Sequence, residues 1–434
     1  MASWPETVLK DIRQAVAENS RAYRRQRAAE VVEVVEIVPV APVVPVALDK
    51  AIEVFRRYLH LPDLDPLLVV AAAAVANLSG ERSPLWLLVI GPPSSGKTEI
   101  ISGLTRLPDA VYAATLTESA LLSGTPKNER SKDSTGGLLR RIPTPGILVM
   151  KDFGSVLAQN RDARASALAA LREVYDGSWT RAVGTDGGRL LEWSGKVGLI
   201  AGGTPSYDRH HAVIAALGDR FILVRLADFE HDASGLAALT HAGREGTMRQ
   251  ELDDALAGLV MSADMRRQRA LTDVEKRELV RLARYTGTAR TGVERNGYTD
   301  ELLVMPEPEG PGRLVVALNQ LLGGLWAIGC DDVTAWRIVR RVARDTVPSL
   351  RTTILRELMK LSGPETKLFA PQRTSDIAQN VGIVTKSAHR ILDDLALIGL
   401  TTRTKNSSAG NSIDLWEASE LLRDLWPHEG STEK

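Results

Sequence analysis

Residues 85–98 read LWLLVIGPPSSGKT, and this stretch decides the fold. Its first half is a continuous apolar run, typical of a strand that is buried on both faces of a parallel sheet. Its second half has the spacing G-x-x-x-x-G-K-T from Gly91 to Thr98, in which the glycines let the backbone curl so that its N–H groups face phosphate oxygens. The stretch therefore predicts a nucleoside-triphosphate site between a strand and a helix.

The predicted loop supplies both backbone and side-chain ligands. Lys97 is expected to reach the β- and γ-phosphates of ATP, and Thr98 to place its hydroxyl on Mg²⁺. The helix expected to begin near Lys97 adds the positive end of its dipole. The predicted nucleotide contacts are Gly91, Pro92, Pro93, Ser94, Ser95, Gly96, Lys97 and Thr98.

Three further apolar runs, at 146–150, 196–203 and 220–226, alternate with helical stretches. This alternation indicates an α/β domain with a parallel sheet. A carboxylate is expected where one of these strands ends, to hold Mg²⁺ and polarise water. Asp152 follows the run 146–150, and the roles of metal ligand and of base both fit it. Carboxylates that could stand in for it follow on the next expected helix, at Glu173 and Asp176.

Residues 176–203 predict a β-hairpin ahead of a buried strand. The runs WTRAV and RLLEW flank GTDGG, whose Asp-Gly-Gly supplies the positive-φ residues of a tight turn. Arg181 and Arg189 flank this turn and are expected to reach a nucleic-acid backbone. Three other polar residues stand at element ends: Thr204 after a strand, Arg220 before a strand and Arg313 at the start of a helix.

The composition is that of a globular protein of two or three domains, with 434 residues, 44% of them hydrophobic. Lys+Arg and Asp+Glu both total 54, so nucleic-acid contacts must come from local patches. A single cysteine, Cys330, fits a reducing cytosol. The polar start of the chain shows no secretory signal, and the apolar stretch 67–78 is too short for a bilayer, so a cytoplasmic protein without a membrane partner is expected.

The stretch from WLLVIGPPSSGKTE through KDF and LREVYDG to LGDRF resembles AAA+ ATPases, over roughly residues 48–420. The hairpin resembles the subgroup that contains the minichromosome maintenance helicases, and the whole is similar to replicative helicases of phages and mobile islands, including the staphylococcal cassette type. The resemblance implies that Thr204 is sensor 1, Arg220 the arginine finger and Arg313 sensor 2. The Lys-Asp-Phe sequence at 151–153 departs from the family's usual Asp-Glu and leaves the base open.

The resemblance also implies an ATP- and Mg²⁺-dependent ring, most often a hexamer, that moves on DNA. Residues 115–141 would then face the pore, with Lys127, Arg130 and Lys132 in a polar loop. Two alternatives remain open at this point. One is a DNA-binding switch ATPase, in transcription, transposition or phage defence, that does not unwind DNA. The other is an ATPase that remodels proteins.

The last part of the chain has a different pattern, in which three helical segments precede two short strands around NSSAGN. This order resembles a winged helix-turn-helix, whose third helix enters the major groove. Lys386, His389 and Arg390 would lie on the exposed face of that helix, and Arg403 and Lys405 on the wing. Because the helix also carries DDLALIG, a protein contact remains an alternative to duplex DNA.

The predicted fold class is therefore α/β: an AAA+ P-loop ATPase domain with a helical lid, followed by a C-terminal winged helix-turn-helix. The predicted units are an N-terminal helix with a Pro/Val-rich linker (1–47), the ATPase core (48–230), the lid (231–346), the winged helix (347–420) and a tail (421–434).

Overall fold

The computed structural model describes most of the chain, in ten stretches. The predicted pore cations Lys127, Arg130 and Lys132 lie outside them, as do the first 41 residues. The described residues are 42–79, 83–123, 136–184, 188–211, 214, 219–227, 231–296, 298–360, 370–408 and 411–427.

A five-stranded, wholly parallel sheet forms the centre of the molecule and confirms the predicted α/β class. Each residue of the inner strand β1 is buried, as the apolar run predicts. The predicted runs at 146–150, 196–203 and 220–226 all form strands of this sheet. In spatial order the strands are β2 (Ala110–Tyr112), β3 (Gly146–Met150), β6 (Val197–Gly203), β1 (Trp86–Ile90) and β7 (Phe221–Arg225).

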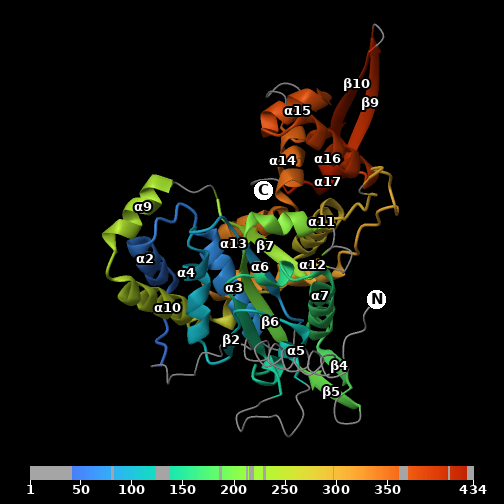
Figure 1. Ribbon diagram of the computed structural model, residues 1–434. Coiled ribbons are helices and arrows are strands. Elements are labelled where there is room, and N and C mark those ends of the chain that lie inside the picture. The colour runs from blue at the N-terminus through green and yellow to red at the C-terminus, as the bar shows by residue number, and fades with distance from the viewer. Residues whose placement is uncertain are drawn as a thin grey trace, which may run out of the picture.

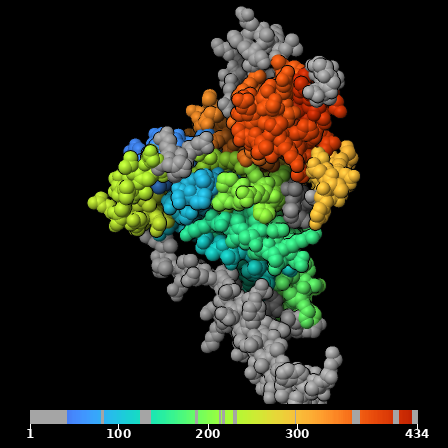
Figure 2. Space-filling model, turned by 45° about the horizontal axis from the view of Figure 1, so that its top comes forward, coloured from blue at the N-terminus to red at the C-terminus, as the bar shows by residue number. Residues whose placement is uncertain are grey.

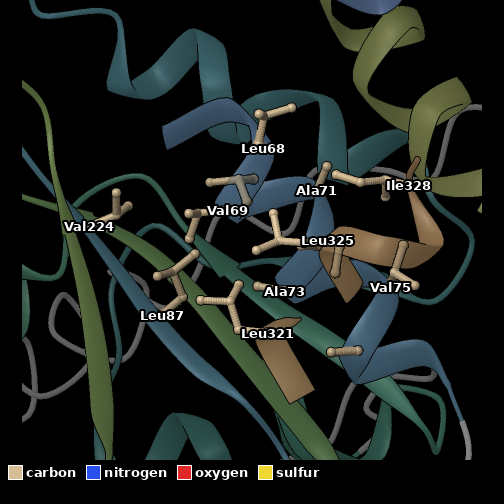
Figure 3. Close-up of a cluster of buried hydrophobic side chains, with 14 of the residues drawn as sticks. Leu68, Val69, Ala71, Ala73, Val75, Leu87, Val224, Leu321, Leu325 and Ile328 are labelled. Carbon is tan, nitrogen blue, oxygen red and sulfur yellow. The ribbon is translucent and has the colours of Figure 1, made fainter. Parts of the chain in front are cut away.

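One face of the sheet is covered by helices that come from both sides of it in the sequence. Helix α3 (Asp65–Leu78) is buried along almost its whole length, because α12 (Gly312–Ala327) packs directly on it. Their side chains interleave with those of the sheet in one apolar core, where Leu87, Leu321 and Leu325 lie close to α3 (Figure 3). A Cβ on Gly324 would lie 2.2 Å from the carbonyl oxygen of Ala72, so the two backbones are nearly in contact.

The helices of 231–346 share this core with the sheet. Helix α10 (Glu245–Met261) packs on the helices next to the phosphate loop, and α13 (Asp332–Asp345) packs on β7. The segment expected to be a helical lid is therefore continuous with the ATPase core. The extended residues 42–47 also lie on α10, where the Val46 N–H donates to the Gly258 carbonyl at 2.9 Å.

The opposite face of the sheet is covered by α7 (Arg161–Tyr175), which leads into the hairpin of β4 (Ser178–Val183) and β5 (Arg189–Ser194). The antiparallel register, with Trp179 opposite Trp193, confirms the predicted hairpin. The hairpin extends from the lower end of the molecule in Figure 1, far from the C-terminal strands β9 and β10.

The C-terminal part has its own core, which is continuous with α11 (Asp273–Ala289) through the fully buried Tyr285. Four helices and a three-stranded antiparallel sheet of order β8-β10-β9 build it, at the top of Figure 1. Its elements are α14 (Ser349–Leu358), β8 (Gln372–Arg373), α15 (Thr374–Val381), α16 (Thr385–Leu397), β9 (Thr401–Ser408), β10 (Asn411–Ala418) and α17 (Glu420–Leu425).

Shorter elements complete the fold, and Figure 2 shows how they cover its surface. In the described stretches, no helix is both long and apolar enough to cross a membrane. The remaining helices are α2 (Leu48–Tyr58), α4 (Lys97–Ser102), α5 (Glu118–Leu121), α6 (Gly154–Leu157) and α9 (His231–Thr240), with 3₁₀ turns η1 (Gly103–Arg106), η3 (Leu138–Arg140), η4 (Pro205–His210) and η5 (Met265–Arg267).

Candidate nucleotide site

The loop between β1 and α4 has the backbone that its sequence predicts. Ser94 and Gly96 both adopt left-handed conformations, with φ of 61° and 81°. A Cβ on Gly91 would lie 2.8 Å from the Ser95 hydroxyl, so only glycine lets the chain turn back so closely. The Gly91 N–H donates to the Gly203 carbonyl at 3.1 Å and ties the loop to the end of β6.

The backbone N–H groups of this loop fit an anion. Within the described stretches, those of Ser94, Ser95 and Gly96 donate to no protein acceptor. Successive N–H groups that lack a partner, in a turn that enters a helix, form a concave site for phosphate oxygens. The cradle thus has the donors that a triphosphate requires.

Lys97 lies across this cradle. Its ammonium donates to the carbonyl oxygens of Gly91, at 2.8 Å, and Pro92, and lies 3.3 Å from the Ser95 hydroxyl. Burial lowers the pKa of Lys97, while the charges of Asp152 and Glu99 oppose that shift. A bound phosphate would replace the loop's own carbonyls as acceptors and would favour the charged lysine.

Asp152 lies at the same edge of the sheet, immediately after β3. The next residue, Phe153, donates its N–H to the Gly202 carbonyl at 2.8 Å, which fixes the turn against β6. The Asp152 carboxylate accepts from the Gly154 N–H at 2.8 Å and is otherwise exposed. Since its charge acts on Lys97, the structure brings these two predicted residues together.

Thr204 and Thr98 complete the polar residues of this edge. Thr204 follows β6, which lies between β1 and β3, and its hydroxyl shares a hydrogen bond of 2.6 Å with Ser206. Thr98 is exposed in the first turn of α4. Ligands of open parallel sheets bind at the carboxyl ends of the strands, where all four of these side chains lie.

Glu173 and Asp176 lie at the opposite end of the sheet, where strands β1 and β7 begin. They belong to the last turn of α7 and its cap, where the Tyr175 ring packs against Trp86, the first residue of β1, at 5.2 Å. Neither carboxylate is therefore next to the phosphate loop of its own chain. In the described stretches, Asp152 is the first carboxylate after β3, at the end of the sheet that carries the loop.

Arg220 and Arg313 also lie at this end of the sheet, where the strands have their amino ends, and we call it the amino edge. Arg220 precedes Phe221, which pairs with Trp86, and donates to Asp176 at 3.2 Å from above the Tyr175 ring. Burial lowers the pKa of Arg220, and the charge of Arg313 adds to this effect. A five-residue strand is about 16 Å long. The predicted sensor 2 residue Arg313 is thus near the predicted finger, at the end of the sheet opposite to its own phosphate loop.

An ionic network that sequence patterns do not reveal lies at the carboxyl end of β7. Arg225 donates to both carboxylate oxygens of Asp208, at 2.8 and 3.1 Å, and Arg341 of α13 donates to Asp63 at 2.6 Å. Asp63 follows shortly after Leu61, a methyl of which lies 4.0 Å from where a Cβ on Gly96 would be. The sequence signal for this network was the spacing of basic and acidic residues on α13, and that spacing does not identify which residues pair.

Asp208 links this network to the C-terminal part. It accepts hydrogen bonds from the N–H and the hydroxyl of Ser349, at 3.0 and 2.7 Å, where α14 begins. Asp208 belongs to η4, which follows Thr204 directly. We call the end of the sheet that carries the phosphate loop, Asp152 and Thr204 the phosphate edge. A short chain of contacts therefore connects the phosphate edge with the first helix of the C-terminal part.

Several predicted DNA contacts are engaged within the chain. Arg181 donates to Glu118 at 2.8 Å and to the Leu122 carbonyl at 2.6 Å, and so anchors the hairpin on α5. Arg390 lies 3.4 Å from Asp300. Arg189 is partly buried in β5.

The wing arginine Arg403 is held by Asp393 and Asp414, at 3.2 and 2.6 Å, and His389 bridges the same two carboxylates. In contrast, Lys386 and Lys405 are exposed and make no ion pair with any described residue. Among the predicted DNA contacts of the C-terminal part, these two lysines are the ones that carry no described ion pair.

Solved structures resemble this chain distantly. The A form apo structure of the NrS-1 C-terminal region is 11% identical over 88% of this chain and 79% of that one, with a TM-score of 0.25. A second structure of that region has the same identity and coverage with a TM-score of 0.28. The Aeropyrum pernix ORC1 protein in complex with DNA is 14% identical over 85% of this chain and 95% of that one, with a TM-score of 0.25.

No known protein-family model and no curated protein sequence matches the chain. TM-scores this low carry no argument about fold or function, so both rest on the chain's own geometry.

Proposed function

We propose that this chain is an ATPase whose hydrolysis drives movement on DNA. The observation that supports this is the phosphate edge, where unpartnered loop N–H groups, Lys97 and Asp152 meet at the ends of β1 and β3. The loop and Lys97 would hold the phosphates of ATP, and Thr98 and Asp152 would hold Mg²⁺. The bound metal supplies Lewis-acid stabilisation of the charge on the transferred phosphoryl group.

The remaining residues of each proposed active site would come from two subunits. Thr204 would orient the γ-phosphate side of the site, with Ser206 fixing its hydroxyl. Arg220 and Arg313 lie at the opposite edge, so the site that they could serve belongs to a neighbouring copy. The proposed object is a ring, most often a hexamer in the AAA+ class, with active sites between subunits.

The DNA assignment rests on the C-terminal part, where the arrangement of three helices and a β-hairpin fits a winged helix-turn-helix. Lys386 on α16 and Lys405 on β9 would contact duplex phosphates, and the β4–β5 hairpin would contact a single strand. We propose a translocase or helicase that acts, in the cytoplasm, in the replication of a phage or mobile element.

A DNA-binding switch ATPase that does not unwind DNA is the second candidate. The observation that favours it is that Arg181 and Arg403, two cations that a DNA motor would use, are each paired with a carboxylate of the same chain. In such a protein, ATP hydrolysis would reset the C-terminal part through Asp208 and Ser349 without translocation.

The test begins with ATP turnover, measured with and without single-stranded DNA, for the unaltered chain and for Lys97→Ala. We expect turnover that single strands stimulate and that the substitution abolishes, because Lys97 is the only charged residue of the loop 91–98. Normal turnover by Lys97→Ala would refute the nucleotide site.

A forked duplex separates the two candidates. Unwinding that requires ATP supports the motor. Hydrolysis that responds to one duplex sequence, with no unwinding, supports the switch.

A further inference from the structure

Helix α9 exposes an apolar face that the fold leaves uncovered. Leu236 and Leu239, one turn apart, are 65% and 74% exposed. The helix is nevertheless held in place, because the His241 that follows it packs edge-on against Tyr58 at 5.0 Å and bonds the Arg57 carbonyl at 3.1 Å. A fixed helix that presents adjacent leucines to solvent is typical of an interaction site.

The surroundings of this face carry cations. Arg56, Arg244 and Arg249 are exposed and form no ion pair with a described residue, whereas only one carboxylate of α9, Asp232, is exposed there without such a pair. Of the other nearby acids, Glu251 pairs with Arg57 at 3.1 Å, whereas Glu245 accepts from the Gly243 N–H at 3.0 Å and keeps its charge, so three unpaired arginines stand against two unpaired carboxylates. The α9 face, meaning Leu236 and Leu239 with these arginines, is therefore apolar with a positive rim.

A second uncovered apolar segment lies between α11 and α12. Leu303, Val304 and Met305 are 59%, 63% and 64% exposed. The segment is fixed at its start, since the Leu303 N–H donates to the Glu294 carbonyl at 3.0 Å.

A cavity of about 520 Å³ opens beside this segment, lined in part by Val304, Met305 and Pro306. These three residues form its apolar wall, while Asp219, Arg290, Glu294, Glu307 and Glu309 line much of the rest. We call residues 303–306 with this cavity the 303–306 groove.

The rim of this groove is acidic. Glu294, Glu301 and Glu307 are exposed and form no ion pair with a described residue. Its remaining charges are paired, as in Glu309 with Arg290 and Arg313. The charge of this rim is thus opposite to that of the α9 face.

The two surfaces lie on opposite sides of the molecule. Helix α9 forms the left edge and the segment around residue 300 the right edge in both Figure 1 and Figure 2. A single chain cannot bring them together, but two copies placed head to tail can.

Each surface also shares its side with one half of the proposed active site. On the α9 side, α10 packs on α4 of the phosphate loop, and Asp253 bonds the Ser102 hydroxyl at 2.5 Å. On the other side, Glu309 of the groove pairs with Arg313, and the cavity is lined by Asp219, which precedes Arg220.

We propose that the α9 face of one copy docks on the 303–306 groove of a second copy. Leu236 and Leu239 contact Val304 and Met305, and the arginine rim meets the glutamate rim. The contact is heterologous, so repetition closes a ring or extends a filament. It deepens the proposed function and rests on it in one respect, namely that the arginine edge of one copy then faces the phosphate edge of the next.

Two double variants test the contact by sedimentation velocity of the full chain with an ATP analogue that resists hydrolysis. Leu236→Glu with Leu239→Glu places carboxylates against the glutamate rim, and Val304→Glu with Met305→Glu places carboxylates against Leu236 and Leu239, so that the two altered surfaces also repel each other. Each should lower the association constant at least tenfold. Val274→Glu, on the exposed first turn of α11 outside both surfaces, should assemble like the unaltered chain.

Mixing the two double variants gives the sharpest outcome. The first retains an intact groove and the second an intact α9 face, so an equimolar mixture should form a 1:1 dimer and nothing larger. A mixture that stays monomeric, a mixture that forms larger species, or an unaltered chain that stays monomeric at all concentrations would each overturn the proposal. Circular dichroism and retained nucleotide binding verify that each variant is folded.

The failure of this contact is distinguishable from failure of the proposed function. Assembly is read from sedimentation, whereas the nucleotide site is read from binding and turnover of Lys97→Ala. If assembly follows these expectations while Lys97→Ala turns over ATP normally, the contact is supported and the proposed nucleotide site is refuted.

Discussion

At the scale of single residues, the phosphate edge depends on one carboxylate. Asp152→Asn should retain ATP binding and stop hydrolysis, because the amide oxygen still accepts the Gly154 N–H while the charge is lost. Nucleotide affinity and steady-state turnover measure the two effects. Glu173→Gln, at the opposite edge of the sheet, is the matched control and should turn over ATP normally. If Asp152→Asn keeps turnover within a few fold, the catalytic carboxylate is elsewhere.

His211 gives a prediction about pH. Burial lowers the pKa of His211 from 6.5 to about 4, and within the described stretches its Nε2 has no hydrogen-bond partner. The pKa of the folded state is below that of the unfolded state, so the unfolded chain takes up the proton first as the pH falls. The contribution to stability is complete above about pH 6.5 and is lost between there and pH 4.

The comparison with His211→Asn measures this contribution. Between pH 7.5 and pH 5, the free energy of unfolding in urea should fall by about 2 kcal/mol less in the variant than in the unaltered chain. Equal losses in both proteins would show that another group controls the acid side of the stability curve.

At the scale of elements, β7 carries an arginine at each end, and the two have different surroundings. Arg225 is locked to Asp208 at the phosphate edge, whereas Arg220 pairs with the exposed Asp176 at the amino edge. Arg220→Ala should leave nucleotide binding nearly intact and lower hydrolysis by a factor on the order of 10³, as for other arginines that act in trans.

Mixing Arg220→Ala with Asp152→Asn should restore part of the turnover, because some subunit interfaces then hold both intact groups. The absence of rescue, together with a monomer in solution, would identify Arg220 as a structural arginine that holds Asp176 and Tyr175.

The cations of α16 and β9 give the test of duplex binding. Lys386→Ala with Lys405→Ala should reduce the slope of log K against log salt by about 2, since each lost phosphate contact accounts for about 0.9. Arg403→Ala should change the slope less, because Asp393 and Asp414 already hold the guanidinium. A larger effect of Arg403 than of the two lysines would mean that DNA breaks this ionic cluster on binding.

These elements also show what a sequence can predict. The strands and the phosphate loop were accessible because apolar runs and glycine spacing are local properties. The partner of Arg181 was not, since Glu118 lies 63 residues away. The place of Arg313 was equally hidden, because helical periodicity says which side of α12 is buried and does not say against what. For the same reason, the helical pattern of residues 231–346 did not show that these helices share a core with the sheet.

At the scale of the whole molecule, the close approach of α3 and α12 sets the stability of the shared core. Gly324→Ala should destabilise the chain by about 3 kcal/mol, because the new Cβ would meet the Ala72 backbone at 2.2 Å. Gly312→Ala, in the first turn of the same helix with nothing within 4 Å, should be neutral or slightly stabilising. Thermal unfolding of both variants measures the difference, and equal melting temperatures would contradict this account of the packing.

The contact of α3 with α12 also restricts how hydrolysis can produce mechanical work. Two helix backbones this close cannot slide without steric overlap, so the sheet and the helices on its α3 face form a stiff block. A stroke of the nucleotide site cannot be a hinge motion within that block. The displacement has to leave through segments at its surface, and the shortest route runs from Thr204 along η4 to Asp208 and Ser349. In the proposed ATPase, α14 would then transmit the displacement to the C-terminal part.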